Sequence, residues 1–243
     1  MGCWPGAGHS PEVWEKAPRD PVCAGDLAVD AFLKHELTEL LPEAGWLSEE
    51  SADSPERLTR GFVWVVDPID GTRDYIRGRR GWAVSVALVG GESPLLGYLC
   101  APARGELWRA EAGRGSSRNG IPLRASVRCE LAGARVPATA LRRLDADLIP
   151  VEQPNSIALR MAMVAADEAD LVATMRWGSE WDLAAAGLIA REAGAVATDI
   201  IGAPLRYNKA DPRIFGVLVT APAIHDAAVR RLAPRARKAA TGD

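Results

Sequence analysis

Long apolar runs and a basic excess are both missing from this 243-residue sequence. No apolar stretch approaches the roughly 20 residues that a membrane-spanning helix needs, and the N-terminus lacks a basic segment followed by an apolar one. We therefore expect no membrane partner and a cytoplasmic location. The 29 Lys and Arg are outnumbered by 32 Asp and Glu. With no positive excess to neutralise a phosphate backbone, nucleic acid is not expected as the main partner.

Cysteine and histidine are also scarce. The four cysteines form no Cys-x-x-Cys pair, and the three histidines are far apart in the sequence: Cys3, Cys23, Cys100 and Cys129; His9, His35 and His225. This spacing favours reduced thiols over a disulfide framework and suggests no Cys/His zinc site. What is present is ordinary for a globular protein, since 48% of the residues are apolar and 25% are charged.

Four parts follow one another along the chain. Residues 1–21 are rich in Gly and Pro and predict an irregular lead-in, whereas 233–243 predict a fraying tail. Between them lie an α+β half over 22–125 and an α/β half over 126–232, in which helices and strands alternate. Helices are expected over 25–41, 155–166 and 182–193, and strands over 62–66, 82–89, 95–99, 106–110, 171–174, 195–198 and 215–220.

The most informative segment is Asp67-Pro-Ile-Asp-Gly-Thr72, where a predicted strand delivers two carboxylates three residues apart. Further acids stand at Glu49-Glu50, at Asp26 near the head of the first helix, and at Asp182 near the head of a later one. Carboxylates that meet at one point repel unless cations lie between them. Oxygen-only ligands select hard cations, so Mg²⁺ is the first choice, with Mn²⁺ and Ca²⁺ as competitors.

Two such ions, roughly 3.5–4 Å apart, would form the clamp used for in-line phosphoryl transfer. The pattern therefore indicates hydrolysis of phosphate esters. For any one of these acids alone, a helix cap or a solvated turn is an equally good interpretation.

Taken together, the motifs resemble the lithium-sensitive, Mg²⁺-dependent phosphatases of the inositol monophosphatase superfamily. The chain has the acidic pair Glu49-Glu50, the Asp67–Thr72 loop and the Trp181–Ala185 helix start in the family's order, and the resemblance covers about 20–232. It implies a layered α-β-α-β-α fold. It also implies a small phosphorylated substrate and two or three Mg²⁺ ions per site, and it allows a homodimer, as in many relatives.

The resemblance assigns a role to each matching residue. It makes metal ligands of the carboxylates of Glu49, Asp67, Asp70 and Asp182 and of the backbone carbonyl of Ile69. The backbone N–H groups of Gly71 and Thr72 would hold the substrate phosphate. Thr72 and Glu49 would orient the nucleophilic water, and Asp26 would support a more weakly bound metal and water. Asp182 would also contact the substrate.

Within the superfamily, the segments 47–50, 73–80 and 101–106 resemble the bacterial 3'(2'),5'-bisphosphate nucleotidases of the CysQ type. Inositol monophosphatases usually place a glutamate seven residues before the aspartate of the Trp-Asp pair, and here that position is Met175. The prediction is therefore removal of the 3'-phosphate of 3'-phosphoadenosine 5'-phosphate. A second phosphate would give a purpose to arginines such as Arg160, because guanidinium binds phosphate bidentately. The other candidates for binding this second phosphate are Arg77, Arg79 and Arg80. The alternative interpretation of these three arginines is a solvated surface loop.

Two other functions stay open at this point. The chain could be an inositol-1-monophosphatase or another sugar-phosphate phosphatase of the same family, or a non-catalytic member that binds a partner. A different mechanism is formally suggested by Cys129 and Arg135, which have the Cys-x5-Arg spacing of thiolate phosphatases. Cys129 has no neighbouring histidine and no glycine-rich cradle, which a thiolate phosphatase needs. A haloacid-dehalogenase-type aspartyl nucleophile fails, because its aspartates are separated by one residue and Asp67 and Asp70 by two.

Two departures from the family pattern stand at the front of the chain. Cys23 takes the place of the usual Ser or Thr before the first aspartate. The amphipathic helix with which relatives normally begin has too few helical residues before Asp20, so the fold is expected to lack its usual first helix. That loss would expose apolar surface.

Overall fold

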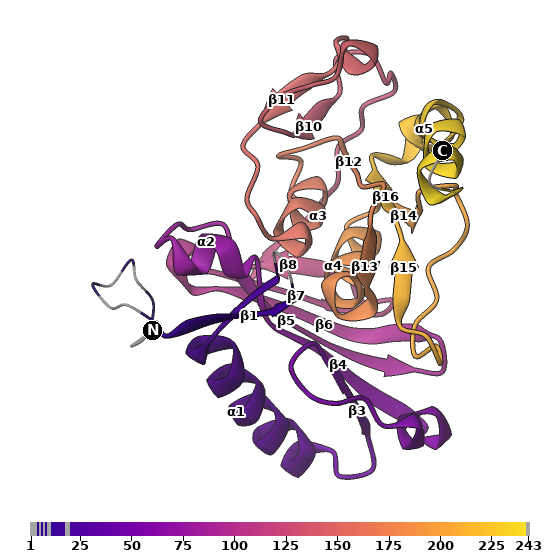
Figure 1. Cartoon of the computed structure of the whole chain (residues 1–243). Coiled ribbons are helices and arrows are strands. Elements are labelled where there is room, and N and C mark those ends of the chain that lie inside the picture. Colours follow the sequence, from indigo (N-terminus) through magenta and orange to yellow (C-terminus); the bar gives the residue numbers. More distant parts are fainter. Residues whose placement is uncertain (1–3, 5, 7, 9–10, 18–19, 242–243) are drawn as a thin grey trace.

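Alternating helical and sheet layers build the molecule, in the order α-β-α-β-α (Figure 1). The computed structural model describes residues 4, 6, 8, 11–17 and 20–241. None of the helices in this described part combines the length and the apolar character that crossing a bilayer requires.

A seven-stranded sheet forms the larger β-layer, in the order β3-β4-β5-β6-β7-β8-β9. Only β3 and β4 pair in parallel, and every later pair is antiparallel. Its strands are β3 (Gly45–Ser48), β4 (Phe62–Asp70), β5 (Ala83–Gly90), β6 (Ser93–Ala101), β7 (Glu106–Glu111), β8 (Ser116–Arg118) and β9 (Ile121–Pro122).

Helices cover both faces of this sheet. On one face lie α3 (Ile157–Ala165) and α4 (Glu180–Glu192), whose small apolar residues let α4 approach closely. Gly97 of β6 shows how close the approach is, because a Cβ there would lie 2.8 Å from the carbonyl oxygen of Ala185. On the other face α1 (Ala24–Leu40) packs along β4. No other described segment covers its outer side, and Phe32 is 62% exposed.

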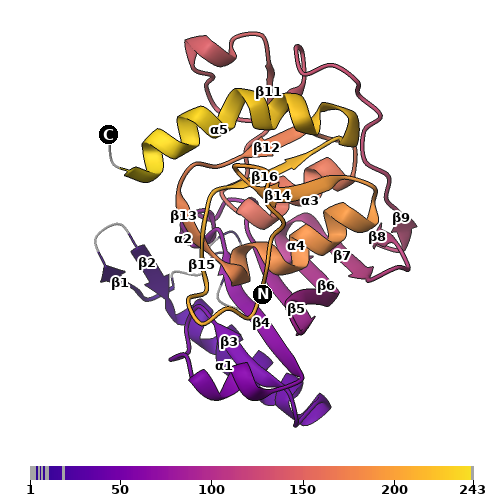
Figure 2. The ribbon, with the colours of Figure 1, turned by 90° about the vertical axis from the view of Figure 1, so that its right-hand side faces the viewer.

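A second sheet and the last helix complete the layers (Figure 2). The strands β12 (Leu171–Ala173), β14 (Val196–Asp199) and β16 (Val217–Thr220) form an antiparallel sheet in the order β12-β16-β14. Helix α5 (His225–Thr241) packs on it through Leu232 and Ala236. Two ribbons flank these layers, β10 (Arg135–Pro137) with β11 (Ile149–Val151), and β13 (Trp177–Ser179) with β15 (Arg213–Phe215).

The structure differs from the sequence expectations at both ends. Within the expected irregular lead-in, β1 (Val13–Ala17) pairs with β2 (Asp20–Cys23) as a hairpin beside α1. The expected fraying tail is helical to Thr241, because the buried Ala236 holds it against the small sheet. No α-helix precedes Ala24 among the residues that the structure describes. The short turns α2 (Thr72–Ile76) and η2 (Pro55–Thr59) follow the two acidic segments.

Candidate active site

Strand β4 carries the acidic loop further than the sequence predicted. Its ladder with β5 continues past Asp67 to Asp70, with an irregularity between the two residues. Pro68 lies in this irregular segment, and proline has no N–H to donate to a ladder. A bulge redirects side chains. It brings two aspartates of one strand, both buried, toward the same cavity.

Two more aspartates reach the same region from helix starts. Asp26 is the third residue of α1 and Asp182 the third residue of α4. Each accepts a bond from the backbone N–H of its own cap residue: Cys23 N to Asp26 Oδ2 and Ser179 N to Asp182 Oδ2, both 2.8 Å. Each aspartate is therefore both the third-position partner in a capping box and a candidate site residue. The cap fixes the carboxylate and leaves its second oxygen for other partners.

Cys23 is the N-cap of α1, the position where the family usually has Ser or Thr. It is fully buried, and its side chain accepts from the backbone of α1 within the capping box. Burial, together with the hydrogen bond and charge of Asp26, raises the pKa of the thiol to about 12. The side chain is therefore a neutral cap.

Asp70 is held by a residue that the sequence reading missed. Ser156 Oγ donates to Asp70 Oδ2 at 2.5 Å, and the N–H of Ala158 donates to the same oxygen at 2.7 Å. Ser156 is also the N-cap of α3, since its Oγ accepts from Leu159 N at 2.9 Å. A serine before a helix is common, so no sequence signal distinguished this one.

Glu49, Asp67 and Asp182 each offer a carboxylate oxygen within 4.8 Å of the others. Burial is the main cause of a raised pKa at all three, and the negative charge of neighbouring carboxylates adds to it, although Lys16 opposes the rise at Glu49. The pKa of Glu49 rises to about 7, that of Asp182 to about 8, and that of Asp67 well above its ordinary value. Burial also raises the pKa of Asp70, against the hydrogen bond from Ser156.

This cluster fits a hard divalent cation. Its donors are all oxygens, and burial and like charge raise the pKa of its carboxylates, an effect that a bound cation would offset. The surrounding cavity has a volume of about 160 Å³. Except for Asp26 and Arg160, every residue assigned by resemblance lines it: Glu49, Asp67, Ile69, Asp70, Gly71, Thr72 and Asp182.

Thr72 connects this cavity to Asp26. Its Oγ1 lies 3.0 Å from the carbonyl oxygen of Ile69 and 3.4 Å from Asp26 Oδ1, and it can donate its single proton to only one of them at a time. Gly71, just before it, has a φ of +93°. A Cβ on Gly71 would lie 2.8 Å from the carbonyl oxygen of Gly81, so both conformation and space require glycine.

Lys16, on the N-terminal hairpin, is a second residue that sequence reasoning missed. Its Nζ lies 3.2 Å from Glu49 Oε1 and 2.6 Å from Glu50 Oε1. Burial opposes its charge, but the hydrogen bond that it donates to Glu50 and the negative charge of Glu49 raise its pKa above the usual value. The lysine therefore places a fixed positive charge at the edge of the acidic cluster. It fell in the segment expected to be irregular, where nothing linked it to Glu49.

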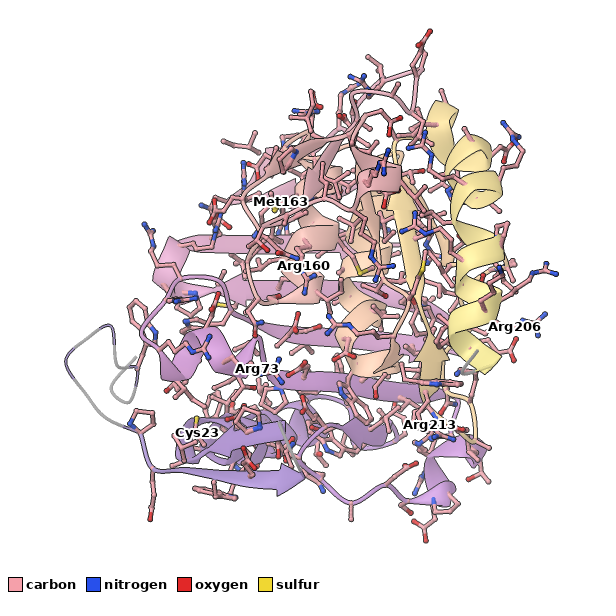
Figure 3. All side chains as sticks on the ribbon, turned by 45° about the horizontal axis from the view of Figure 1, so that its top comes forward. Cys23, Arg73, Arg160, Met163, Arg206 and Arg213 are labelled. Atoms are coloured by element: carbon pink, nitrogen blue, oxygen red, sulfur yellow. The ribbon has the colours of Figure 1, made fainter. Side chains whose placement is uncertain are left out.

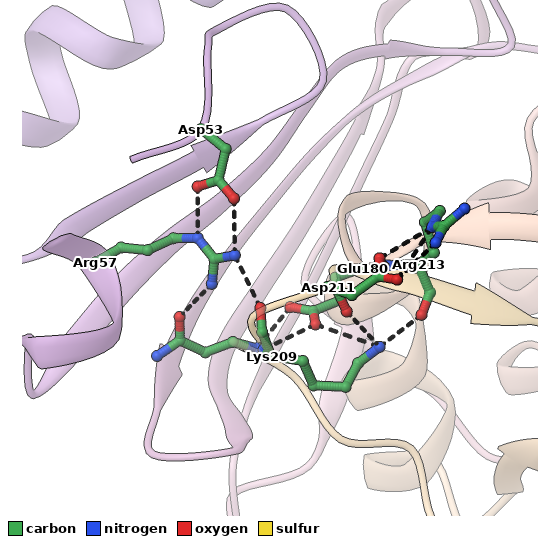
Figure 4. A network of polar contacts seen from close by, with 7 residues as sticks. Asp53, Arg57, Glu180, Lys209, Asp211 and Arg213 are labelled. Atoms are coloured by element: carbon green, nitrogen blue, oxygen red, sulfur yellow. Dashed lines mark hydrogen bonds and ion pairs between the residues drawn. The ribbon is translucent and has the colours of Figure 1, made fainter. Parts of the chain in front are cut away.

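A partly buried polar network ties the two sides of the site together (Figure 4). Arg57, only 2% exposed, follows the Glu49-Glu50 segment and donates to Asp53 at 2.7 and 2.9 Å. It also donates to Asn208 Oδ1 at 2.7 Å and to the carbonyl of Lys209 at 2.8 Å. The backbone N–H groups of Asn208 and Lys209 donate in turn to Glu180, the first residue of α4. The network links the neighbourhood of Glu49 to the helix that carries Asp182.

A second cavity, of about 250 Å³, opens beside the acidic cluster and shares Asp70 and Asp182 with it. Arg160, Arg176 and Trp177 line it. Arg160 extends from α3 (Figure 3) and donates to the carbonyls of Asn155 at 2.8 Å and Ser156 at 3.2 Å. Burial and the nearby Arg176 lower its pKa, whereas the charge of Asp70 opposes this.

Trp177 is a candidate binding surface in this second cavity. It is 60% exposed, and its ring packs edge-on to Phe215 at 5.4 Å between centroids. Among the other tryptophans that the structure describes, Trp64, Trp82 and Trp108 are core residues, whereas Trp14 is 40% exposed.

Other candidates from the sequence do not line either cavity. Arg79 lies 3.8 Å from Asp74, and Arg80 donates to the carbonyl of Ala103 at 2.7 Å; Arg77 also lines neither cavity. The Cys-x5-Arg spacing builds no thiolate site either. Cys129 is exposed and contacts the carbonyl of Val127. Arg135 instead binds Asp170 and Asp167.

Comparisons with known proteins agree with this geometry. The model of the inositol monophosphatase family matches residues 7–236. The chain is 35% identical over 218 residues to a 3'-phosphoadenosine 5'-phosphate phosphatase of Mycobacterium leprae, covering 83% of this chain and 78% of that protein. It is 30% identical to inositol monophosphatase 1 of Bos taurus, covering 78% and 75%. Among solved structures, an IMPase of Thermotoga maritima superposes with a TM-score of 0.81 at 25% identity, covering 97% and 91%. The five-layer fold expected from the resemblance is thereby confirmed.

Proposed function

Because the chain belongs to the inositol monophosphatase family and is a phosphatase, we propose that it removes the 3'-phosphate of 3'-phosphoadenosine 5'-phosphate, giving AMP and phosphate. The observation that carries this proposal is the cavity of about 250 Å³ beside Asp70 and Asp182. Two guanidinium groups, of Arg160 and Arg176, and one exposed indole line it. A substrate with a second phosphate and an aromatic base uses all three, because guanidinium binds phosphate and rings stack on rings.

Metal binding belongs to the acidic cluster. The family's phosphatases are metal-dependent, and the proposed ligands are the carboxylates of Glu49, Asp67, Asp70 and Asp182 with the carbonyl oxygen of Ile69. The proposed cation is Mg²⁺, with two or three ions per site, since the donors are all oxygens. Such cations would make water a stronger acid and offset the negative charge on the phosphoryl group.

The chain's own groups hold and orient the reactants. Gly71 and Thr72 line the cavity, and their backbone N–H groups would bind the phosphate oxygens. When Thr72 donates its proton to Asp26, its oxygen is left to accept a bond from water, which Glu49 can also contact. The water oxygen then forms the new P–O bond as the bond to O3' breaks.

A second candidate is hydrolysis of inositol 1-phosphate or another sugar phosphate, favoured by the 30% identity to the bovine inositol monophosphatase. Against it stands Met175 at the position where inositol-specific relatives carry glutamate. Met175 offers no acceptor for a ring hydroxyl, and it lies in the wall of a different cavity, under α5.

The test is phosphate release from 3'-phosphoadenosine 5'-phosphate, inositol 1-phosphate and fructose 1,6-bisphosphate, measured side by side with Mg²⁺. We expect the highest kcat/KM for the nucleotide, and a higher value for inositol phosphate would overturn the substrate assignment. Arg176→Gln should raise KM for the nucleotide about tenfold with little change for inositol 1-phosphate, since one guanidinium–phosphate contact is worth about 1.4 kcal/mol or more. The control is Arg206→Gln, an exposed arginine that pairs with Glu92 and lines neither cavity.

A further inference from the structure

A third cavity, of about 340 Å³, lies under α5. Its walls come from three elements: Leu232 of α5, Val136 of the β10–β11 ribbon, and Leu171 of β12, with Leu148 and Met175 nearby. Its size falls within the about 300–1,000 Å³ of typical ligand pockets. Most of these side chains are apolar, so the floor is suited to an apolar group.

This cavity continues the one that holds the proposed second-phosphate site. Arg160, Thr174 and Arg176 line both of them. The inner cavity reaches Asp70 and Asp182 in the acidic cluster. One elongated molecule could therefore have its 3'-phosphate at the acidic cluster and its far end under α5.

Unbalanced positive charge marks the junction and rim of the third cavity. Arg231 and Arg235 are neutralised, since they make paired bonds to Asp147 and Asp145 that tie α5 to the ribbon loop. Within the described part of the chain, Arg142 and Arg176 have no carboxylate partner, and Arg160 donates to backbone carbonyls alone. Guanidinium groups without carboxylates are suited to phosphate oxygens.

The arginines lie at the junction of the two cavities and the apolar floor lies beyond them. A matching ligand therefore carries phosphate groups at the junction and apolar groups farther out. A nucleotide that ended at its 5'-phosphate would occupy the inner cavity beside Asp70 and Asp182. It would leave the apolar floor of the cavity under α5 exposed to water. A sulfate added to that phosphate would still be too small and too polar to cover it.

We propose that the cavity under α5 receives the 5' substituent of a 3'-phosphonucleotide, namely a diphosphate joined to an extended arm that carries apolar groups, as in coenzyme A, whose arm has a dimethyl group and several methylenes. This inference rests on the proposed function, because it places the 3'-phosphate at the acidic cluster. The reaction is the same hydrolysis: water supplies the oxygen of the released phosphate, the bond between phosphorus and O3' breaks, and O3' takes a proton. The product keeps its diphosphate and arm.

The test compares coenzyme A with 3'-phosphoadenosine 5'-phosphate as substrates, using two matched pairs of variants. Leu141 lines the cavity, whereas Leu144 in the same loop is 74% exposed and does not. Leu141→Glu should raise KM for coenzyme A at least tenfold, because it opposes the diphosphate with a like charge, and should change kcat/KM for the shorter nucleotide less than twofold. Leu144→Glu should change neither. Arg142→Gln should likewise raise KM for coenzyme A alone. Its control is Arg143→Gln, because the neighbouring Arg143 does not line the cavity.

Hydrolysis of the shorter nucleotide without hydrolysis of coenzyme A would overturn the inference, and so would an equal effect of Leu141→Glu on both substrates or on neither. If neither compound is hydrolysed, the proposed function fails by itself. Calorimetry then decides the cavity separately: dephospho-coenzyme A should bind at least tenfold more tightly than AMP, and Leu141→Glu should abolish the difference. Equal binding of the two ligands would overturn the inference as well.

Discussion

Replacing Ser156 with alanine should weaken both the fold and the affinity for divalent cations. The hydroxyl donates to Asp70 at 2.5 Å and accepts from Leu159 N at 2.9 Å, and Ser156 is fully buried, so no water can replace it. A hydrogen bond to a charged group is worth about 1.5–3 kcal/mol, and an N-cap about 0.5–2 kcal/mol. We expect Ser156→Ala to lower the free energy of unfolding by about 3 kcal/mol, from these two ranges.

For a chain of this size that loss corresponds to a Tm lower by about 6–12 °C. A partner that orients a metal-binding carboxylate typically contributes about 10–100-fold to metal affinity. The Mg²⁺ concentration that gives half-maximal phosphatase activity should therefore rise by at least tenfold. The assays are thermal unfolding, with and without Mg²⁺, and a Mg²⁺ titration of activity.

Ser54 provides the matched control. It is also an N-cap, of η2, but it is exposed and accepts only one long bond, 3.4 Å from Glu56 N. Ser54→Ala should cost less than about 1 kcal/mol, as expected for an exposed cap, and leave the Mg²⁺ dependence unchanged. Equal unfolding temperatures and equal Mg²⁺ requirements of Ser156→Ala and Ser54→Ala would contradict the proposed role of Ser156.

Three further predictions concern other residues. Gly71→Ala should lower kcat/KM at least a hundredfold and destabilise the fold by about 2 kcal/mol or more, since its φ of +93° and a backbone oxygen at 2.8 Å leave no room for a Cβ; unchanged activity would contradict this. Lys16→Met should lower Tm by about 2–4 °C without Mg²⁺, because the positive charge of Lys16 beside Glu49 is lost. With Mg²⁺ the decrease in Tm should be smaller, and equal decreases with and without Mg²⁺ would contradict the prediction. Burial raises the pKa of Asp170, but bonds from Arg135 more than offset this and lower it to about 2, so its stabilising effect is full above about pH 4 and fades toward pH 2. Asp170→Asn should therefore destabilise at pH 7 far more than near pH 2 in denaturant titrations, and a cost independent of pH would disprove the pairing.

The sequence indicated most of the acidic site, because Asp67, Asp70 and Thr72 stand in one short motif. Strand β4 was predicted too short, since the bulge that carries Asp67 to Asp70 depends on pairing with β5, which no local pattern records. The tail was misjudged for the same reason. Its alanines and arginines, interrupted by Pro234, look like a fraying end, but the buried Ala236 anchors them.

The residues that escaped prediction are those whose role is set by a distant partner. Ser156 lies 86 residues after Asp70, and Arg57 lies 151 residues before Asn208. Lys16 reaches Glu49 from a hairpin that showed no periodicity. Long-range contacts of this kind arise only when the layers pack, so one sequence shows the chemical groups but not which of them meet.

The most direct test of the whole account is product analysis. The protein is incubated with 3'-phosphoadenosine 5'-phosphate and Mg²⁺, and the nucleotide products are separated by ion-exchange chromatography. We predict AMP that keeps its 5'-phosphate, one phosphate released per AMP formed, and no reaction once EDTA has removed the metal. Formation of adenosine 3'-phosphate, or turnover that persists in EDTA, would contradict it.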